Sequence, residues 1–232
     1  RQLILSNEIE DPDLMAEALS GKLGRKVELL VPKRGEKAEL VDAVLEGEAM
    51  ASGARHGDNV LPSLFGGAVL VSPSDPTRYR QLAVGCELHV ALVVPRVQVL
   101  TRDARALLPG QVPLSGAVGN AAEFAFLLDA LARGDAEAAG HAIMQDTLVE
   151  PLRARLVPCY DAVRQAALAA GAYGCALSGS GPTLFALCRN AQSAQHVARE
   201  MQAASRNAGI EAGAHAVRAC SQGARTLSQT LD

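Results

Sequence analysis

The sequence predicts an α+β protein in which one sheet of split β-α-β topology is backed by helices. Two observations support this class. Short apolar runs alternate with longer segments of helical periodicity along the chain, and two of these runs, Tyr173–Leu177 and Leu184–Leu187, are separated only by a loop of small residues. At 232 residues, of which 49% are hydrophobic, the chain is long enough to bury a substantial core.

The amino-terminal part of the chain is predicted to begin with a β-α-β unit. Strands are expected at Gln2–Ser6 and Lys26–Val31, where apolar residues cluster. The helix between them is expected over Pro12–Leu23, because Asp11 is a preferred capping residue and proline is favoured in a first helical turn. Residues 32–37 are interpreted as a charged turn.

The next segment is predicted to start with a helix over Glu39–Ser52, whose apolar positions recur at helical spacing. A polar loop over residues 53–59 follows, and a turn at Gly66 and Gly67 leads into a strand that ends near Ser72. Residues 72–80 are rich in Pro, Ser and Asp and are interpreted as a connector.

From Cys86 onward the pattern changes to longer elements. The nearly continuous apolar run Glu87–Pro95 predicts a buried strand. Four helices are expected before the paired strands, over Thr101–Leu108, Gly116–Arg133, Ala136–Thr147 and Pro151–Ala170, the last interrupted at Pro158. After the paired strands we expect a helix over Ala191–Ala208 and a strand over Ala212–Cys220.

Composition excludes several classes of protein. With a formal net charge of −3 there is no basic excess to suggest a nucleic-acid surface, and no stretch approaches the roughly 18 uninterrupted apolar residues of a membrane span. The five cysteines are scattered and form no C-x-x-C pair, which indicates reduced thiols in the cytoplasm and neither a disulfide framework nor a zinc site.

The loop of small residues, Ser178–Thr183, is the strongest candidate for a binding element. Gly179 and Gly181 permit backbone angles that other residues avoid, and they let a ligand approach the main chain. Such a loop can surround an anion with backbone N–H groups, with the hydroxyls of Ser178 and Ser180 nearby. The alternative is a tight hairpin turn without a ligand.

Four motifs, in order, resemble those of the homoserine kinases, which belong to the GHMP family of small-molecule kinases. They are His56-Gly-Asp-Asn-Val with Gly66-Gly67 downstream, Thr101-Arg-Asp-Ala-Arg105, Val149-Glu-Pro-Leu-Arg153 and the loop region Gly174–Cys188. The resemblance covers residues 39–232. It implies that residues 39–85 are the remnant of the family's amino-terminal domain, and that residues 86–232 are its carboxy-terminal domain.

The resemblance also implies roles for individual residues. Glu48, eight positions before His56, falls where the family has a magnesium-binding glutamate. Residues that resemble positions around the amino-acid substrate are His56, Asp58, Thr101, Arg105, Arg153 and Gly181. The active-site loop would be formed by Ser178, Gly179, Ser180 and Gly181. The alternatives are a solvated helix residue for Glu48, a loop residue for His56 and surface charges for the arginines.

The activity that the resemblance implies is ATP- and Mg²⁺-dependent phosphoryl transfer to the hydroxyl of L-homoserine, a step of threonine biosynthesis. It leaves a homodimer open. Kinases of this family also carry a Gly- and Ser-rich loop that holds the nucleotide phosphates ahead of the Glu48 helix. No segment between Arg1 and Val41 has that composition. We therefore expect impaired phosphoryl transfer, and one alternative is a non-catalytic domain that only binds a small amino acid.

The first 38 residues resemble a different protein, the UvrC component of the UvrABC excision nuclease. The most specific part is Val31-Pro-Lys-Arg-Gly-Glu-Lys37. Residues 1–38 are therefore expected to be a β-α-β segment of separate origin, with a chimeric or misassembled junction between Ala38 and Ala43. This segment leaves open a third alternative for function, a module associated with DNA repair.

Overall fold

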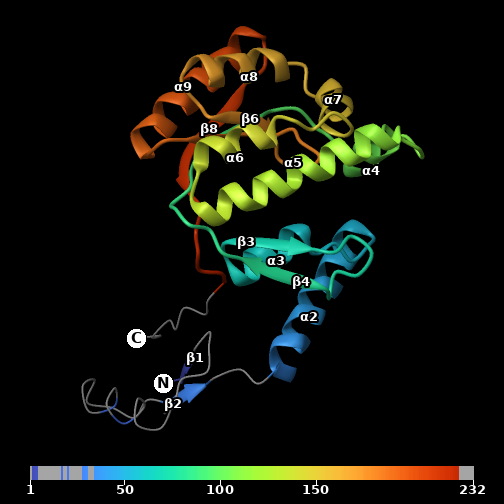
Figure 1. Ribbon diagram of the computed structural model, residues 1–232, viewed down its shortest axis with the longest axis vertical. Helices are drawn as coiled ribbons and strands as arrows, with labels where there is room; N and C mark the ends of the chain where they lie inside the picture. Colours follow the sequence, from blue (N-terminus) through green and yellow to red (C-terminus); the bar gives the residue numbers. More distant parts are fainter. Residues whose placement is uncertain (1, 5–16, 18–19, 21–27, 31–33, 225–232) are drawn as a thin grey trace. The chain divides into compact units, whose positions relative to one another are not determined.

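The computed structural model describes residues 2–4, 17, 20, 28–30 and 34–224 (Figure 1). The chain divides into two compact units. Unit 1 comprises Arg1–Gln81 together with Gly223–Asp232, and unit 2 comprises Leu82–Gln222. Within unit 1, strand β1 (Gln2–Ile4) pairs in parallel with β2 (Glu28–Leu30), as the β-α-β prediction requires. The helix expected over residues 12–23 lies almost entirely outside the described residues.

The rest of unit 1 consists of two helices and a two-stranded sheet. These elements are α2 (Arg34–Ser52), α3 (Gly57–Phe65), β3 (Ala68–Val71) and β4 (Tyr79–Leu82). The two helices pack through the buried side chains of Val41 and Leu45 on α2 and Leu61 on α3. The rings of Phe65 and Tyr79 stack with their centroids 4.9 Å apart, which joins the end of α3 to the sheet.

Three local predictions for this unit are wrong. Helix α2 already begins at Arg34, α3 begins at Gly57 within the expected polar loop, and β4 begins at Tyr79 within the expected connector. Local signals favoured loops because Gly, Asn, Asp and Pro are frequent there, but burial of Leu61 against α2 stabilises α3. Helix α2 runs without a break through residues 38–43, where the sequence predicts the junction.

Unit 2 is built on a four-stranded antiparallel sheet in the order β6-β7-β5-β8. Its strands are β5 (His89–Pro95), β6 (Gly174–Leu177), β7 (Leu184–Cys188) and β8 (Ala212–Arg218). Ala91 at the centre of β5 lies opposite Ala186 on one side and Ala216 on the other. This order, in which the first and third strands of the unit are neighbours, is the predicted split β-α-β topology.

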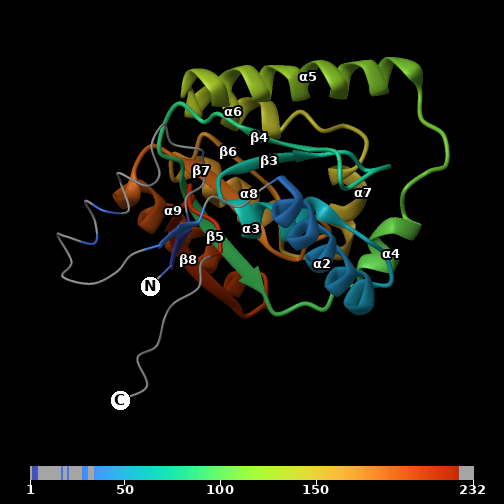
Figure 2. The ribbon, with the colours of Figure 1, turned by 90° about the horizontal axis from the view of Figure 1, so that it is seen from below.

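Helices cover both faces of this sheet (Figures 1 and 2). On β7, Leu184, Ala186 and Cys188 face a core shared with α8 (Tyr160–Ala169) and α9 (Ala191–Asn207). Leu187 on the same strand joins a second core with α5 (Leu114–Arg133) and α6 (Ala136–Ile143). Side chains of a strand alternate between its two faces, so strands covered on both sides are apolar throughout.

The remaining helices of unit 2 are short. They are α4 (Thr101–Ala106), α7 (Glu150–Arg153) and the 3₁₀ turn η1 (Ala154–Leu156). The helix predicted over residues 151–170 is therefore divided into α7, η1 and α8. Val157 is extended, with φ −121° and ψ 92°, because the residue before a proline avoids helical angles and Pro158 has no N–H to donate.

Helix α5 is long and apolar enough to cross a membrane by length and composition, with a mean hydropathy of 1.2. Its inner side carries Asn120, which donates a hydrogen bond to Asp146 at 2.7 Å and accepts one from the Thr147 hydroxyl at 3.1 Å. These contacts attach α5 to the segment between α6 and α7. The prediction of no membrane association stays a prediction.

Close packing between α6 and β6 requires glycine on both elements. A Cβ atom on Gly174 would overlap the carbonyl group of Gly140, and one on Gly140 would lie 2.6 Å from the Cβ of Tyr173. We therefore expect Gly174→Ala to lower the free energy of unfolding by about 1–3 kcal/mol, the usual cost of overpacking. Urea unfolding measures the change.

The control for this prediction is Gly119→Ala on the exposed side of α5. A Cβ there meets no atom within 4 Å, and alanine favours a helix over glycine by up to about 1 kcal/mol. The control variant is expected to unfold at an equal or higher urea concentration than the original chain. Equal midpoints for the two variants would contradict the packing argument.

Candidate functional site

The loop between β6 and β7 forms a closed turn that depends on its glycines. The N–H of Ser178 donates to the carbonyl of Thr183 at 2.8 Å, and the N–H of Gly181 donates to the carbonyl of Ser178 at 3.0 Å. Gly179 has φ 60° and Gly181 has φ 83°, angles that favour glycine. Among the residues described, no protein acceptor takes the N–H groups of Gly179 or Ser180, so both remain available to a ligand.

Arg153, in the last turn of α7, lies against this loop. Its Nη1 donates to the carbonyl of Gly179 at 3.0 Å. Its Nε is buried without a hydrogen-bond partner, and no carboxylate in the described part of the chain forms an ion pair with its guanidinium group. A guanidinium group without a protein counter-ion is suited to binding a carboxylate or phosphate from a ligand.

Asp146 fixes the start of α7. Its Oδ1 accepts hydrogen bonds from Asn120 Nδ2 at 2.7 Å and from the N–H groups of Leu148 and Val149 at 2.9 and 3.0 Å. Its Oδ2 accepts from the N–H of Glu150 at 2.9 Å. Burial alone would raise the pKa of Asp146, but these donors outweigh it and the pKa is lowered.

The lowered pKa of Asp146 predicts acid-labile stability. An aspartate of depressed pKa stabilises the fold above its unfolded pKa, near 3.8, and this contribution is lost as the pH falls from there through the folded pKa. Asp146→Asn is therefore expected to lower the free energy of unfolding at pH 6, by an amount that shrinks toward pH 2. Urea unfolding at both pH values measures this. Asp161→Asn, at an exposed position in the first turn of α8, is the control.

A constant difference at the two pH values would show that the contribution of Asp146 to the free energy of unfolding does not depend on its charge. In that case the loss on substitution would come from packing alone.

Thr101 and Arg105 lie four residues apart on α4 and therefore on the same side of that helix. Both are exposed, while Ala104 between them is fully buried. Helix α4 thus presents a hydroxyl and a guanidinium group together.

The three predicted residues of unit 1 lie on α2 and α3. Glu48 follows Val41 and Leu45 at helical spacing, so it lies next to the side of α2 that packs against α3, and it is half-buried. His56 is the residue that precedes α3, and Asp58 lies exposed in its first turn. Helix α2 therefore carries Glu48, and the start of α3 carries His56 and Asp58.

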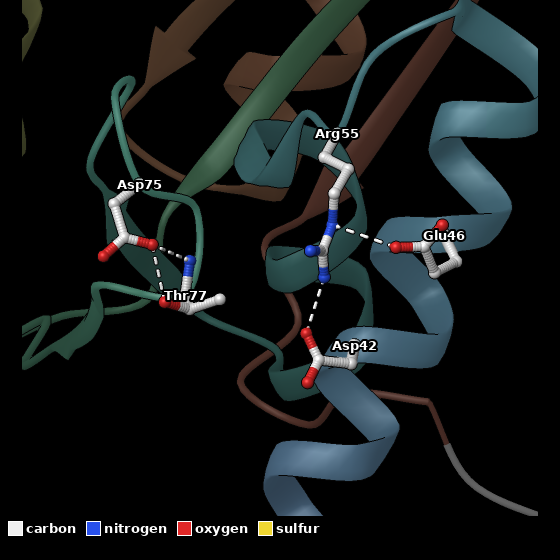
Figure 3. A network of polar contacts seen from close by, with 5 residues as sticks. All are labelled: Asp42, Glu46, Arg55, Asp75 and Thr77. Carbon is white, nitrogen blue, oxygen red and sulfur yellow. Dashed lines mark hydrogen bonds and ion pairs between the residues drawn. The ribbon is translucent and has the colours of Figure 1, made fainter.

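Ion pairs fix the segment that carries His56 against α2 (Figure 3). Arg55 Nη2 lies 2.5 Å from Asp42 Oδ1, and Arg55 Nε lies 3.5 Å from Glu46 Oε1. Asp42 and Glu46 are one helical turn apart, so a single guanidinium group reaches both. The pairs therefore hold the residue immediately before His56 against the side of α2 that carries Asp42 and Glu46.

One carboxylate fits the magnesium that the resemblance implies. Among the described residues, no three His, Cys, Asp or Glu side chains gather into a metal site. Magnesium in kinases is commonly held by one or two carboxylates together with the phosphates of the substrate. Glu48 would supply such a ligand, and its half-buried position on a packed helix gives it a fixed place.

Two cavities of unit 2, of about 480 Å³ and about 320 Å³, lie beside α7. Both are lined by Asp146 and Glu150, and neither is lined by a predicted site residue. The structure thus brings Arg153 to the predicted loop, while Glu48 shares a helix pair with His56 and Asp58. The roles assigned to these residues remain predictions.

Sequence reasoning missed Asn120, Asp146 and Glu150. The sequence pattern around these three residues is weak. Asp146 stands four residues before Glu150, the first residue of α7, while Val149 holds the capping position. Asn120 comes from another helix, so no local pattern joins it to Asp146.

Comparison with known proteins places these features in context. The family described as GHMP kinases C terminal matches residues 127–207, and the family described as UvrC Ribonuclease H-like domain matches residues 1–53. The chain is 37% identical over 196 residues to a homoserine kinase of Chlorobaculum tepidum, which covers 84% of this chain and 60% of that protein. It is 46% identical over 151 residues to a homoserine kinase of Pyrococcus abyssi, covering 65% of this chain and 50% of that protein.

A solved structure extends the similarity. The crystal structure of homoserine kinase from Cytophaga hutchinsonii matches with a TM-score of 0.76 and 31% identity, over 96% of this chain and 84% of that one. Both predicted resemblances are thereby confirmed. The chain spans about half the length of curated relatives that it matches. The UvrC match extends to residue 53, beyond the junction predicted between residues 38 and 43.

Proposed function

We propose that this chain, which belongs to the homoserine kinase family of GHMP kinases, binds L-homoserine for phosphoryl transfer from ATP to its side-chain hydroxyl. The observation that supports this is Arg153, whose guanidinium group contacts the Gly179 carbonyl of the active-site loop and has no ion-pair partner among the described residues. The product would be O-phosphohomoserine, an intermediate of threonine biosynthesis in the cytoplasm.

The substrate is a small zwitterion, and each of its groups has a chemical counterpart among the site residues. Its carboxylate suits the planar guanidinium groups of Arg153 and Arg105, which bind carboxylates through two parallel hydrogen bonds. Its ammonium group suits carboxylate oxygens or backbone carbonyl groups, and Asp58 is the carboxylate that the family resemblance implies. The hydroxyl group of Thr101 adds a polar contact in this proposal.

The transferred phosphoryl group would be placed beside the loop 178–181. The hydroxyl oxygen of homoserine attacks the γ-phosphorus, the bond from that phosphorus to the bridging oxygen of ADP breaks, and the hydroxyl proton is released. The free N–H groups of Gly179 and Ser180 are suited to stabilise negative charge on the transferred group. Magnesium held by Glu48 would neutralise phosphate charge when it is bound.

Isothermal titration calorimetry with L-homoserine tests this proposal. We expect saturable binding of one ligand per chain, and no binding of the L-homoserine methyl ester, which lacks the free carboxylate. Equal affinity for acid and ester would exclude arginine recognition of the carboxylate. Analytical ultracentrifugation would show whether the chain is a homodimer, as the resemblance allows.

A non-catalytic chain that only binds the amino acid is the second candidate. The sequence favours it because no Gly- and Ser-rich phosphate loop is found between Arg1 and Val41. Binding of L-homoserine without ADP release would distinguish this candidate from an active kinase.

The match of residues 1–53 to a UvrC domain is the reason to test DNA binding as well. The net charge of −3 argues against a nucleic-acid surface. We expect no shift of duplex DNA in a gel at low salt. A salt-sensitive shift would support a function in DNA repair.

A further inference from the structure

Glu150, in the first turn of α7, joins three elements of unit 2 through one carboxylate oxygen. Its Oε1 accepts a hydrogen bond from the Tyr160 hydroxyl at 2.6 Å and another from the N–H of Leu177 at 3.0 Å. Tyr160 begins α8, and Leu177 is the last residue of β6. The side chain of Glu150 is therefore held between α7, α8 and the end of a strand.

The Leu177 amide is an edge group of the sheet. Strand β6 lies at the end of the order β6-β7-β5-β8, so on its outer side no described strand of this sheet accepts its N–H groups. A buried N–H without an acceptor costs about 1–3 kcal/mol. Glu150 supplies that acceptor at the residue immediately before Ser178, where the predicted active-site loop begins.

The same short helix contacts the loop a second time. Glu150 and Arg153 are three residues apart on α7, which places them on neighbouring positions of one helix side. Glu150 accepts from Leu177, just ahead of the loop, and Arg153 donates to Gly179 within it. The hydrogen bonds of Asp146 to the N–H groups of Val149 and Glu150 fix the start of this helix in turn.

We propose that Glu150 is a positioning residue, which holds α7 at the end of β6 so that the Arg153 guanidinium group and the loop 178–181 keep one arrangement toward the substrate. This inference rests on the proposed function, because it assigns Glu150 a part in the same site. Glu150 does not contact the substrate in this account. It acts through Arg153 and through the backbone of Leu177.

The surroundings of the Glu150 carboxylate agree with a positioning role. Burial raises the pKa of Glu150, against the lowering effect of the hydrogen bonds from Tyr160 and Leu177, and the nearby charge of Asp146 raises it further. The Tyr160 hydroxyl is correspondingly a poor acid, since burial and its hydrogen bond to Glu150 raise its pKa above the ordinary range. Tyr160 therefore stays protonated and remains a donor to Glu150.

Three variants of the full chain test the inference, with L-homoserine affinity measured by calorimetry and amide positions by ¹⁵N NMR. Glu150→Ala is expected to shift the amide signals of Leu177, Gly179 and Ser180 and to weaken binding about tenfold. Glu150→Gln retains an acceptor oxygen, so it should restore binding to within about threefold. Tyr160→Phe, which removes only the hydroxyl, should shift the Leu177 amide and weaken binding about threefold.

Glu137→Ala is the matched control, because Glu137 is an exposed glutamate in the first turn of α6. It should leave both the affinity and the loop amides unchanged. The inference is overturned if Glu150→Gln binds as weakly as Glu150→Ala, or if the amides of Gly179 and Ser180 do not move in Glu150→Ala. If Glu150→Ala does not fold, the inference is tested with Tyr160→Phe and Glu150→Gln. An unchanged Leu177 amide in Tyr160→Phe would then overturn it.

The two claims fail in different ways. If the original chain does not bind L-homoserine, the proposed function is wrong, while the amide shifts still report whether Glu150 positions the loop. If the original chain binds and the variants change neither affinity nor loop amides, only the positioning role is wrong.

Discussion

Arg153→Ala is expected to weaken L-homoserine binding by about 10- to 100-fold. Hydrogen bonds to charged groups contribute about 1.5–3 kcal/mol each, and every 1.4 kcal/mol corresponds to a tenfold change in Kd. Arg153 has no competing carboxylate among the described residues, so its charge is available to the ligand. Its removal also takes away the hydrogen bond to Gly179 and with it one support of the loop. Calorimetry measures the change in Kd.

Two further variants separate charge from geometry. Arg153→Lys keeps the positive charge but loses the planar fork, so an intermediate loss is expected. Arg155→Ala removes an exposed arginine from η1, two residues away, and should leave the affinity unchanged. Equal losses in Arg153→Ala and Arg155→Ala would mean that general electrostatic attraction, and not a specific contact, holds the substrate.

ATP turnover is expected to be at least a thousandfold lower in this 232-residue polypeptide than in a homoserine kinase that carries the phosphate loop. Removing a single preorganised donor from a charge-stabilising site already costs about 10²–10³ in rate, and the phosphate loop supplies several. Nothing between Arg1 and Val41 has its Gly- and Ser-rich composition. A coupled assay of ADP release in the presence of L-homoserine, ATP and Mg²⁺ measures the rate.

The same assay needs a binding control to be informative. Calorimetry with L-homoserine should show that the amino-acid part of the site is intact in the same preparation. Turnover within tenfold of an active homoserine kinase would refute this prediction and would require another element to hold the nucleotide phosphates.

The sheet of unit 2 could be predicted from the sequence because its strands are governed by local patterns. Strand β5 follows from an apolar run, and the turn between β6 and β7 follows from Gly179 and Gly181, whose positive φ angles other residues avoid. The packing of α6 directly on β6 was not predictable. It depends on Gly140 and Gly174 meeting across two elements, a pairing that no local window contains.

Unit 1 was predicted less well because its helices depend on each other. Helix α3 contains Pro62 and starts at Gly57, so its local propensity is low, and burial of Leu61 against α2 stabilises it. The opposite error occurred in unit 2, at α7 and α8. Apolar periodicity suggested one helix over residues 151–170, while Pro158 divides it.

In the candidate site, too, residues within short motifs could be predicted, whereas contacts between distant segments could not. Motif positions such as Arg153 were recognisable from the sequence, because they stand within short characteristic segments. The hydrogen bonds that hold the helix of Arg153 in place could not be recognised in this way. They involve Asn120, Asp146 and Leu177, which come from separate parts of the chain. Polar groups that meet only after folding leave little pattern in a single sequence.

A titration of ¹⁵N-labelled chain with L-homoserine, followed by NMR, probes most directly whether the named groups serve a single ligand. Saturating shifts with one common Kd are expected within unit 2, at the amides of Gly179 and Gly181, at Arg153 Nε and at the amide of Arg105. The methyl ester should produce none of them. Different Kd values at the loop and at Arg105, or a titration that leaves the loop amides and Arg153 Nε unchanged, would contradict a binding site formed by these groups.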